Sequence, residues 1–141
     1  MKKLFLMVVA MLAMLTTVSA QDQSKYDETY LPAKYAVEKE KPTLVMITAT
    51  WCGPCKMMKN NIMKDVEVEK ILKKMNVVYF DVDQKDLKDI ISKFKPAGFK
   101  GSIPFFAILD NNGKIITTQL GSSDKSKFIV FLNNAFKADK K

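Results

Sequence analysis

The chain has 141 residues and a formal net charge of +8. All 23 of its basic residues are lysine, and it contains neither arginine nor histidine. The lack of histidine excludes Ser-His-Asp and Cys-His catalytic mechanisms. Arginine is the residue best suited to phosphate and guanine recognition, and the lysines are scattered without aromatic residues between them. We therefore interpret the charge as a solvated surface and expect no nucleic acid among the partners.

The first twenty residues have the pattern of a secretory leader. A lysine pair is followed by an apolar stretch, and Val18-Ser19-Ala20 has the small residues of a cleavage signal. The apolar stretch is shorter than the roughly twenty residues of a membrane span, so an uncleaved anchor is the less favoured alternative. We expect residues 1–20 to be a signal peptide and residues 21–141 to be one exported domain in the periplasm or elsewhere outside the cytoplasm, with no stable membrane span after the leader is cleaved.

Hydrophobic periodicity predicts the elements that precede the cysteines. After a polar entry, a helix is expected over residues 32–41, with Pro32 in its first turn and Pro42 beyond its end. Residues 43–49 are apolar and rich in β-branched side chains, which predicts a strand buried on both faces.

The rest of the chain alternates between helical and strand periods. The last two strands are joined by an Asn-Gly step, a strong hairpin signal, and Ser123 is the expected cap of the final helix. The resulting order of elements predicts an α/β fold with a mixed sheet and helices on both faces. The expected helices cover residues 52–62 and 86–94, a stretch with Val68, Ile71, Leu72 and Met75 on one face, and a last helix that has Asp124 in its first turn and buries Phe128, Phe131, Leu132 and Ala135. The expected strands cover residues 77–82, 105–109 and 114–120.

The only two cysteines follow the first predicted strand as Trp51-Cys52-Gly53-Pro54-Cys55. Thiols at this spacing can form a disulfide within one helical turn. At a helix N-terminus, unpaired N–H groups and the helix dipole favour the thiolate and lower the thiol pKa from about 8.5 toward roughly 7 or below. We therefore predict that Cys52 is the catalytic nucleophile and that Cys55 is its catalytic partner.

The residues around the two cysteines are expected to shape this active site. Trp51 would shield the pair and offer an apolar contact, or alternatively serve in packing. Gly53 and Pro54 form the dipeptide between the cysteines, and Pro54 restrains the turn without supplying an N–H group. The composition of this dipeptide affects how well the thiolate is stabilised.

Two structural uses of the cysteine pair are disfavoured. A structural zinc site takes four ligands, and the chain offers two cysteines and no histidine. A purely structural disulfide across so short a loop would remove little chain entropy.

Asp81 and Asp83 could suggest a cation site, but a solvent-facing pair of aspartates at a strand end is favoured. We expect redox chemistry with no metal and no organic cofactor.

Residues 40–137 resemble the thioredoxin family. The resemblance rests on the cysteine motif after a buried strand, on Ile103-Pro104 before the hairpin, and on Leu120-Gly121 at the end of the last strand. It implies a thioredoxin-like fold, with a central mixed sheet, helices on both faces, and a C-terminal hairpin plus helix. It also implies a substrate groove in which Pro104 is cis and lies against the cysteines, the Ile103 backbone pairs with an extended substrate, and Gly121 leaves room for that substrate.

Residues 56–82 resemble one branch of that family more closely, the exported thioredoxin-like domains. These include the C-terminal domain of transmembrane thiol-disulfide interchange proteins, which pass reducing electrons outside the cytoplasm. The resemblance lies in Lys56 after the second cysteine, in Asp65-Val66-Glu67-Val68 and in Leu72. It implies protein disulfides as substrates and a membrane or soluble thiol protein as electron donor.

The chain also departs from the family pattern. Met46 stands where ordinary thioredoxins have a buried acid, and Tyr79 stands at the position of the lysine that partners it. Phe105 replaces the threonine usual after the cis proline. The departures imply different proton handling at Cys55 and an altered substrate groove.

Three functions remain open from the sequence. The first is an exported reductase or electron carrier, which the Gly-Pro dipeptide favours because the family uses it at the reducing end of its range. The second is a disulfide oxidase or isomerase. The third is a non-enzymatic binding module that presents the groove around Pro104 and needs neither cysteine.

Overall fold

The computed structural model describes residues 30, 31, 35 and 37–137. The expected signal peptide over residues 1–20 lies outside this range, as does most of the helix expected over residues 32–41. The described end of that segment is not helical. The backbone N–H of Lys41 donates to the carbonyl of Glu38 at 3.0 Å, and the Asn76 side chain donates to the Glu38 carbonyl at 2.8 Å. The prediction of a helix up to residue 41 is therefore wrong, because a turn tied to Asn76 satisfies these carbonyls instead.

The other predicted elements are present, with shifts of a few residues at their ends. The helix expected over residues 52–62 continues as a wider π-helical turn in its second half, where the N–H of Met63 donates to the carbonyl of Met58 at 2.8 Å. The elements are β1 (Thr43–Thr48), α2 (Gly53–Met57), η3 (Met58–Ile62), α3 (Val66–Leu72), β2 (Asn76–Asp81), η4 (Lys85–Leu87), α4 (Lys88–Ser92), β3 (Phe105–Leu109), β4 (Ile115–Leu120), α5 (Lys125–Asn133) and η5 (Asn134–Phe136).

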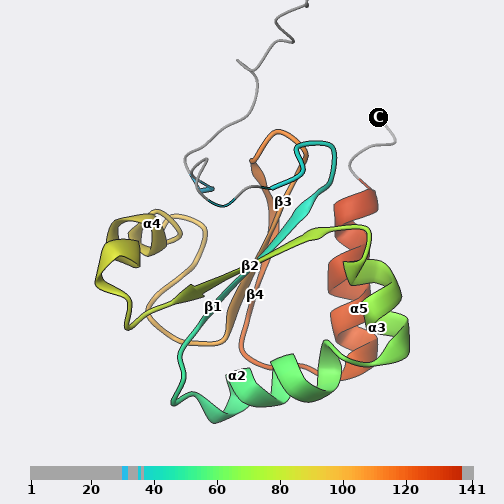
Figure 1. Ribbon diagram of the computed structural model, residues 1–141, viewed down its shortest axis with the longest axis horizontal. Coiled ribbons are helices and arrows are strands. Elements are labelled where there is room, and N and C mark those ends of the chain that lie inside the picture. Colours follow the sequence, from blue (N-terminus) through green and yellow to red (C-terminus); the bar gives the residue numbers. More distant parts are fainter. Residues whose placement is uncertain (1–29, 32–34, 36, 138–141) are drawn as a thin grey trace, which may run out of the picture.

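The strands form one mixed sheet in the order β2-β1-β3-β4. Strand β1 runs parallel to β2, whereas β3 is antiparallel to both β1 and β4. Helices α3 and α5 lie side by side on one face, and α4 covers the other face (Figure 1). The expectation of a mixed sheet with helices on both faces and a terminal hairpin plus helix is confirmed.

The alternation of side chains along β1 divides the core into two apolar clusters. Leu44 and Met46 face the cluster under α3 and α5, while Val45 and Ile47 face the cluster under α4. All six residues of β1 are buried, as expected for a strand covered on both faces. Both cysteines belong to the first cluster, so they pack against the side chains between the sheet and helices α3 and α5.

Helices α3 and α5 each begin at an aspartate that caps the first turn. Asp65 caps α3 by accepting from the N–H of Glu67 at 2.9 Å. Helix α5 is capped by Asp124, whose carboxylate accepts from the N–H of Lys127 at 2.9 Å, so the expected cap at Ser123 is one residue too early. Aspartate at this place also has a favourable interaction with the helix dipole.

No helix in the described ranges is long and apolar enough to span a bilayer.

Candidate active site

Cys52 lies at the N-cap of α2, in the loop that leaves the carboxyl end of β1. Its backbone is extended, its carbonyl accepts from the N–H of Lys56 at 3.1 Å, and its Sγ accepts from the N–H of Cys55 at 3.2 Å. The sulfur thus occupies the position of a capping oxygen. In the reduced protein, this N–H group and the positive end of the helix would stabilise negative charge on the sulfur.

The two cysteines form a disulfide, with an S–S distance of 2.05 Å and a Cα–Cα distance of 5.3 Å. Cys55 is fully buried, whereas Cys52 is 4% exposed. Cys52 is therefore the more accessible of the two cysteines in this oxidised state.

The surroundings of Cys55 are apolar. Met46 is fully buried in the same cluster, and the register of β1 and β2 pairs it with Tyr79. The phenol of Tyr79 is partly buried, which raises its pKa, and the Lys59 ammonium lies 5.3 Å from its ring centroid. Among the residues described, the buried polar side chains are those of the threonines at the two ends of β1, so no carboxylate is fully buried near Cys55 and the Met46 thioether stands at the position of the family's acid. A proton that leaves Cys55 has no buried carboxylate to accept it.

Of the two roles that the sequence suggested for Trp51, packing in the core is excluded. The side chain is 66% exposed, and its Nε1–H donates to Oδ2 of Asp83 at 2.8 Å. The N–H of Asp83 in turn donates to Oδ1 of Asp81 at 2.9 Å. The Asp81 carboxylate therefore holds the turn after β2, and the Asp83 carboxylate holds the indole of Trp51. No group of three or more potential metal ligands occurs among the residues described.

Sequence reasoning missed Asp83 as a partner of Trp51. The signal was the parallel pairing of β1 and β2, which places Thr48 opposite Asp81. Residues that follow neighbouring parallel strands emerge at the same edge of the sheet, so the segments after Thr48 and Asp81 had to meet.

The proposed groove residues meet at the start of β3 and the end of β4. The Ile103–Pro104 peptide is cis, and the carbonyl of Pro104 accepts from the N–H of Gly121 at 2.8 Å. Gly121 has a φ of +81°, and no atom lies within 4 Å of where its Cβ would be. A substituent there would point into open space, and Ile103 packs against both apolar clusters.

Gly53 and Pro54 form the first turn of α2, and both are exposed. No atom lies within 4 Å of a Cβ built on Gly53. The dipeptide between the cysteines is therefore part of the surface that an approaching polypeptide meets.

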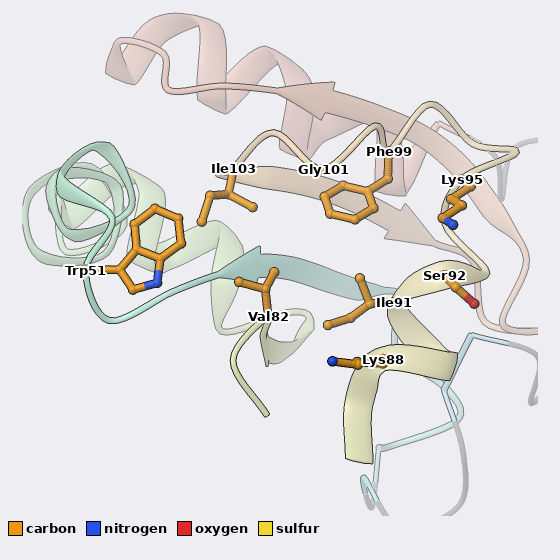
Figure 2. Close-up of a pocket in the computed structure, with 9 residues that line it drawn as sticks. All are labelled: Trp51, Val82, Lys88, Ile91, Ser92, Lys95, Phe99, Gly101 and Ile103. Carbon is orange, nitrogen blue, oxygen red and sulfur yellow. The ribbon is translucent and has the colours of Figure 1, made fainter. Parts of the chain in front are cut away.

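An apolar pocket of about 310 Å³ lies beside Trp51, on the α4 side of the sheet (Figure 2). Its walls come from the loop after β1, from the residue after β2, from α4 and the turn that follows it, and from the loop that precedes β3. Nothing in the sequence pattern indicated the pocket, because its residues come from four separate segments. They are Trp51, Val82, Lys88, Ile91, Ser92, Lys95, Phe99, Gly101 and Ile103.

The family model named Thioredoxin matches residues 23–134. The chain belongs to the thioredoxin family. Thioredoxin from Haemophilus influenzae is 31% identical over 98 residues, which cover 69% of this chain and 82% of the relative. Pig thioredoxin is 38% identical over 69 residues, which cover 45% of this chain and 61% of the relative.

Solved structures share the fold. The oxidised C-terminal domain of DsbD from Neisseria meningitidis has a TM-score of 0.56 at 21% identity, with 78% of this chain and 97% of that chain covered. A Thermus thermophilus thioredoxin has a TM-score of 0.59 at 18% identity, with 77% and 82% covered. Together with the disulfide between Cys52 and Cys55, family membership makes the chain a thiol-disulfide oxidoreductase.

Proposed function

We propose that this chain is an exported reductase of protein disulfides. The observation that carries the proposal is the Cys52–Cys55 disulfide at the start of α2, in which Cys55 is fully buried and Cys52 keeps 4% exposure. The reducing direction is supported by the Gly-Pro dipeptide between the cysteines and by the likeness to an oxidised DsbD domain. Export is supported by the leader pattern at the N-terminus.

The reaction transfers two electrons from the dithiol to a client disulfide. The Cys52 thiolate attacks one client sulfur, a mixed disulfide forms, and the second client sulfur leaves as a thiolate. The Cys55 thiol loses its proton and attacks Sγ of Cys52, which releases the first client sulfur as a second thiolate. The product is the oxidised protein with the disulfide described above. A separate dithiol protein must then reduce it.

The client is held as an extended strand beside the cysteines. The backbone of Ile103 would pair with it, the cis Pro104 would keep that backbone in place, and Gly121 would leave space for its side chains. The open space at Gly121 supports this assignment. Trp51, Gly53 and Pro54 would line the opposite side.

Trapping of the mixed disulfide tests the proposal. Cys55→Ser removes the resolving thiol, so client proteins should remain attached to Cys52 on non-reducing gels and be released by dithiothreitol. Cys52→Ser is the matched control, because its remaining thiol is buried, and it should hold few or no clients. Equal trapping by both variants, or by neither, would contradict exchange through Cys52.

The direction of electron flow is tested by equilibration with glutathione. A reductase should have a potential near that of thioredoxin, about −270 mV, whereas an oxidase would lie near −120 mV. Sequencing of the exported protein tests the leader. Cleavage after Ala20 would give Gln21 as the first residue.

A further inference from the structure

The pocket beside Trp51 has an apolar interior and a basic rim. Val82, Ile91 and Phe99 form its walls, and at one end Trp51 connects it to the cysteine loop (Figure 2). Its volume of about 310 Å³ lies at the small end of the range for ligand pockets, roughly 300–1,000 Å³. This space suits one large side chain and its neighbours on an extended chain.

The rim carries two lysines without acidic partners. Lys88 and Lys95 are exposed, and neither forms an ion pair with a carboxylate within the described ranges. Residues 85–101 contain five lysines and only two aspartates. The local charge is therefore positive, and it is not neutralised by ion pairs at the pocket.

The charge is also arranged along the pocket. Lys95 and Ser92 lie at the end opposite Trp51 (Figure 2). The nearest carboxylate to Trp51 is that of Asp83, which accepts the indole hydrogen bond. A negative group on a ligand would be repelled at the Trp51 end and attracted at the Lys95 end, so the pocket has a polarity that orients its occupant.

We propose that this pocket selects clients in which the reacting cysteine is followed or preceded by a bulky apolar residue and then by acidic residues. The apolar side chain fills the space between Ile91 and Phe99, and the carboxylates lie at Lys88 and Lys95. The inference rests on the proposed function, because it requires the client cystine to be at Cys52. Burial of the apolar side chain supplies most of the affinity, and the charges supply selectivity.

The first test uses matched peptides as symmetrical disulfides. The sequences Cys-Gly-Phe-Glu-Glu, Cys-Gly-Phe-Lys-Lys and Cys-Gly-Ala-Glu-Glu are each made in both chain directions, and the second-order rate constant for their reduction by the pre-reduced protein in a single turnover is measured at low salt. In at least one direction, the first peptide should react roughly three- to tenfold faster than the second, as expected for two exposed ion pairs. It should also exceed the third, and 0.5 M salt should reduce the difference due to charge.

The second test reverses the charge of the rim. Lys88→Glu with Lys95→Glu should reverse the preference between acidic and basic peptides and leave the preference for phenylalanine over alanine. Lys70→Glu with Lys74→Glu is the matched control, since it makes the same change in net charge at exposed positions on the α3 side of the sheet. If the control reverses the preference as well, net charge rather than the pocket is responsible, and the proposal is overturned.

A binding measurement separates this proposal from the proposed function. Trp51 is the only tryptophan of the chain, so its fluorescence reports directly on the pocket. A Cys52→Ser, Cys55→Ser variant is titrated with the same peptides carrying serine in place of cysteine, and the acidic phenylalanine peptide should bind tightest. Equal binding of all peptides overturns the pocket assignment even if every peptide disulfide is reduced. Selective binding without reduction supports the pocket and contradicts the reductase.

Sedimentation of the wild-type protein tests the other occupant, a second copy of the chain. A dimer that the Lys88→Glu, Lys95→Glu variant dissociates would place the protein itself in the pocket and overturn the proposal. A monomer at the assay concentration agrees with a client segment as the occupant.

Discussion

The hydrogen bond between Trp51 and Asp83 should control the position of the indole. Asp83→Ala removes an acceptor that lies 2.8 Å from Nε1. Hydrogen bonds to charged groups contribute about 1.5–3 kcal/mol, but both side chains are largely exposed and water competes for them, which lowers the expected loss to roughly 0.5–1 kcal/mol. This corresponds to a two- to fivefold larger population of Trp51 conformers that have left this position.

The assay combines two measurements on Trp51. In the variant, acrylamide should quench its fluorescence more strongly and the fast component of its anisotropy decay should grow, while the urea midpoint stays nearly constant. Asp83→Asn is the control, because its amide oxygen can still accept the indole hydrogen, and it should resemble the wild type. Identical quenching and anisotropy in wild type and Asp83→Ala would refute the reasoning.

Three further substitutions test a positive-φ glycine, a buried aromatic side chain and a helix cap. Gly121→Ala should cost roughly 1–2 kcal/mol in urea unfolding because of its positive φ, whereas Gly53→Ala, in equally open space without that φ, should be close to neutral. Phe106→Ala, at a fully buried position, should cost about 3–5 kcal/mol by the same measurement. The Lys127 N–H holds the pKa of the Asp124 carboxyl below 3.8, so this carboxylate stabilises the fold above about pH 4 and its contribution fades as the pH falls further. Asp124→Ala should therefore lower Tm at pH 7 but much less near pH 2, while Asp124→Asn should retain the cap at both.

The parts of the fold that could be predicted are those encoded in local patterns. The buried run of β1 and the Asn-Gly hairpin step each reflect a short segment and one physical cause. The helix expected over residues 32–41 failed at its end because Asn76, 35 residues after Lys41, binds the carbonyls of that turn. The hydrophobic periodicity of residues 32–41 contains no information about a distant side chain that binds the carbonyls of this segment.

The site shows the same division between local and distant causes. The N-cap place of Cys52 follows from the motif and the strand before it, so the sequence was sufficient. The bond from Trp51 to Asp83 and the basic rim of the pocket depend on how β2 and α4 pack beside the cysteine loop. They became visible only when the sheet order was known.

The apolar cluster that contains both cysteines affects how long the mixed disulfide with a client persists. No carboxylate is among the buried side chains that the structure describes, so a hydrogen ion leaving the Cys55 sulfur passes to bulk water or to the departing client sulfur. Alkaline conditions should then shorten the life of the covalent complex with the client, and mildly acidic conditions should prolong it. A captured client would be held longest in an acidic environment.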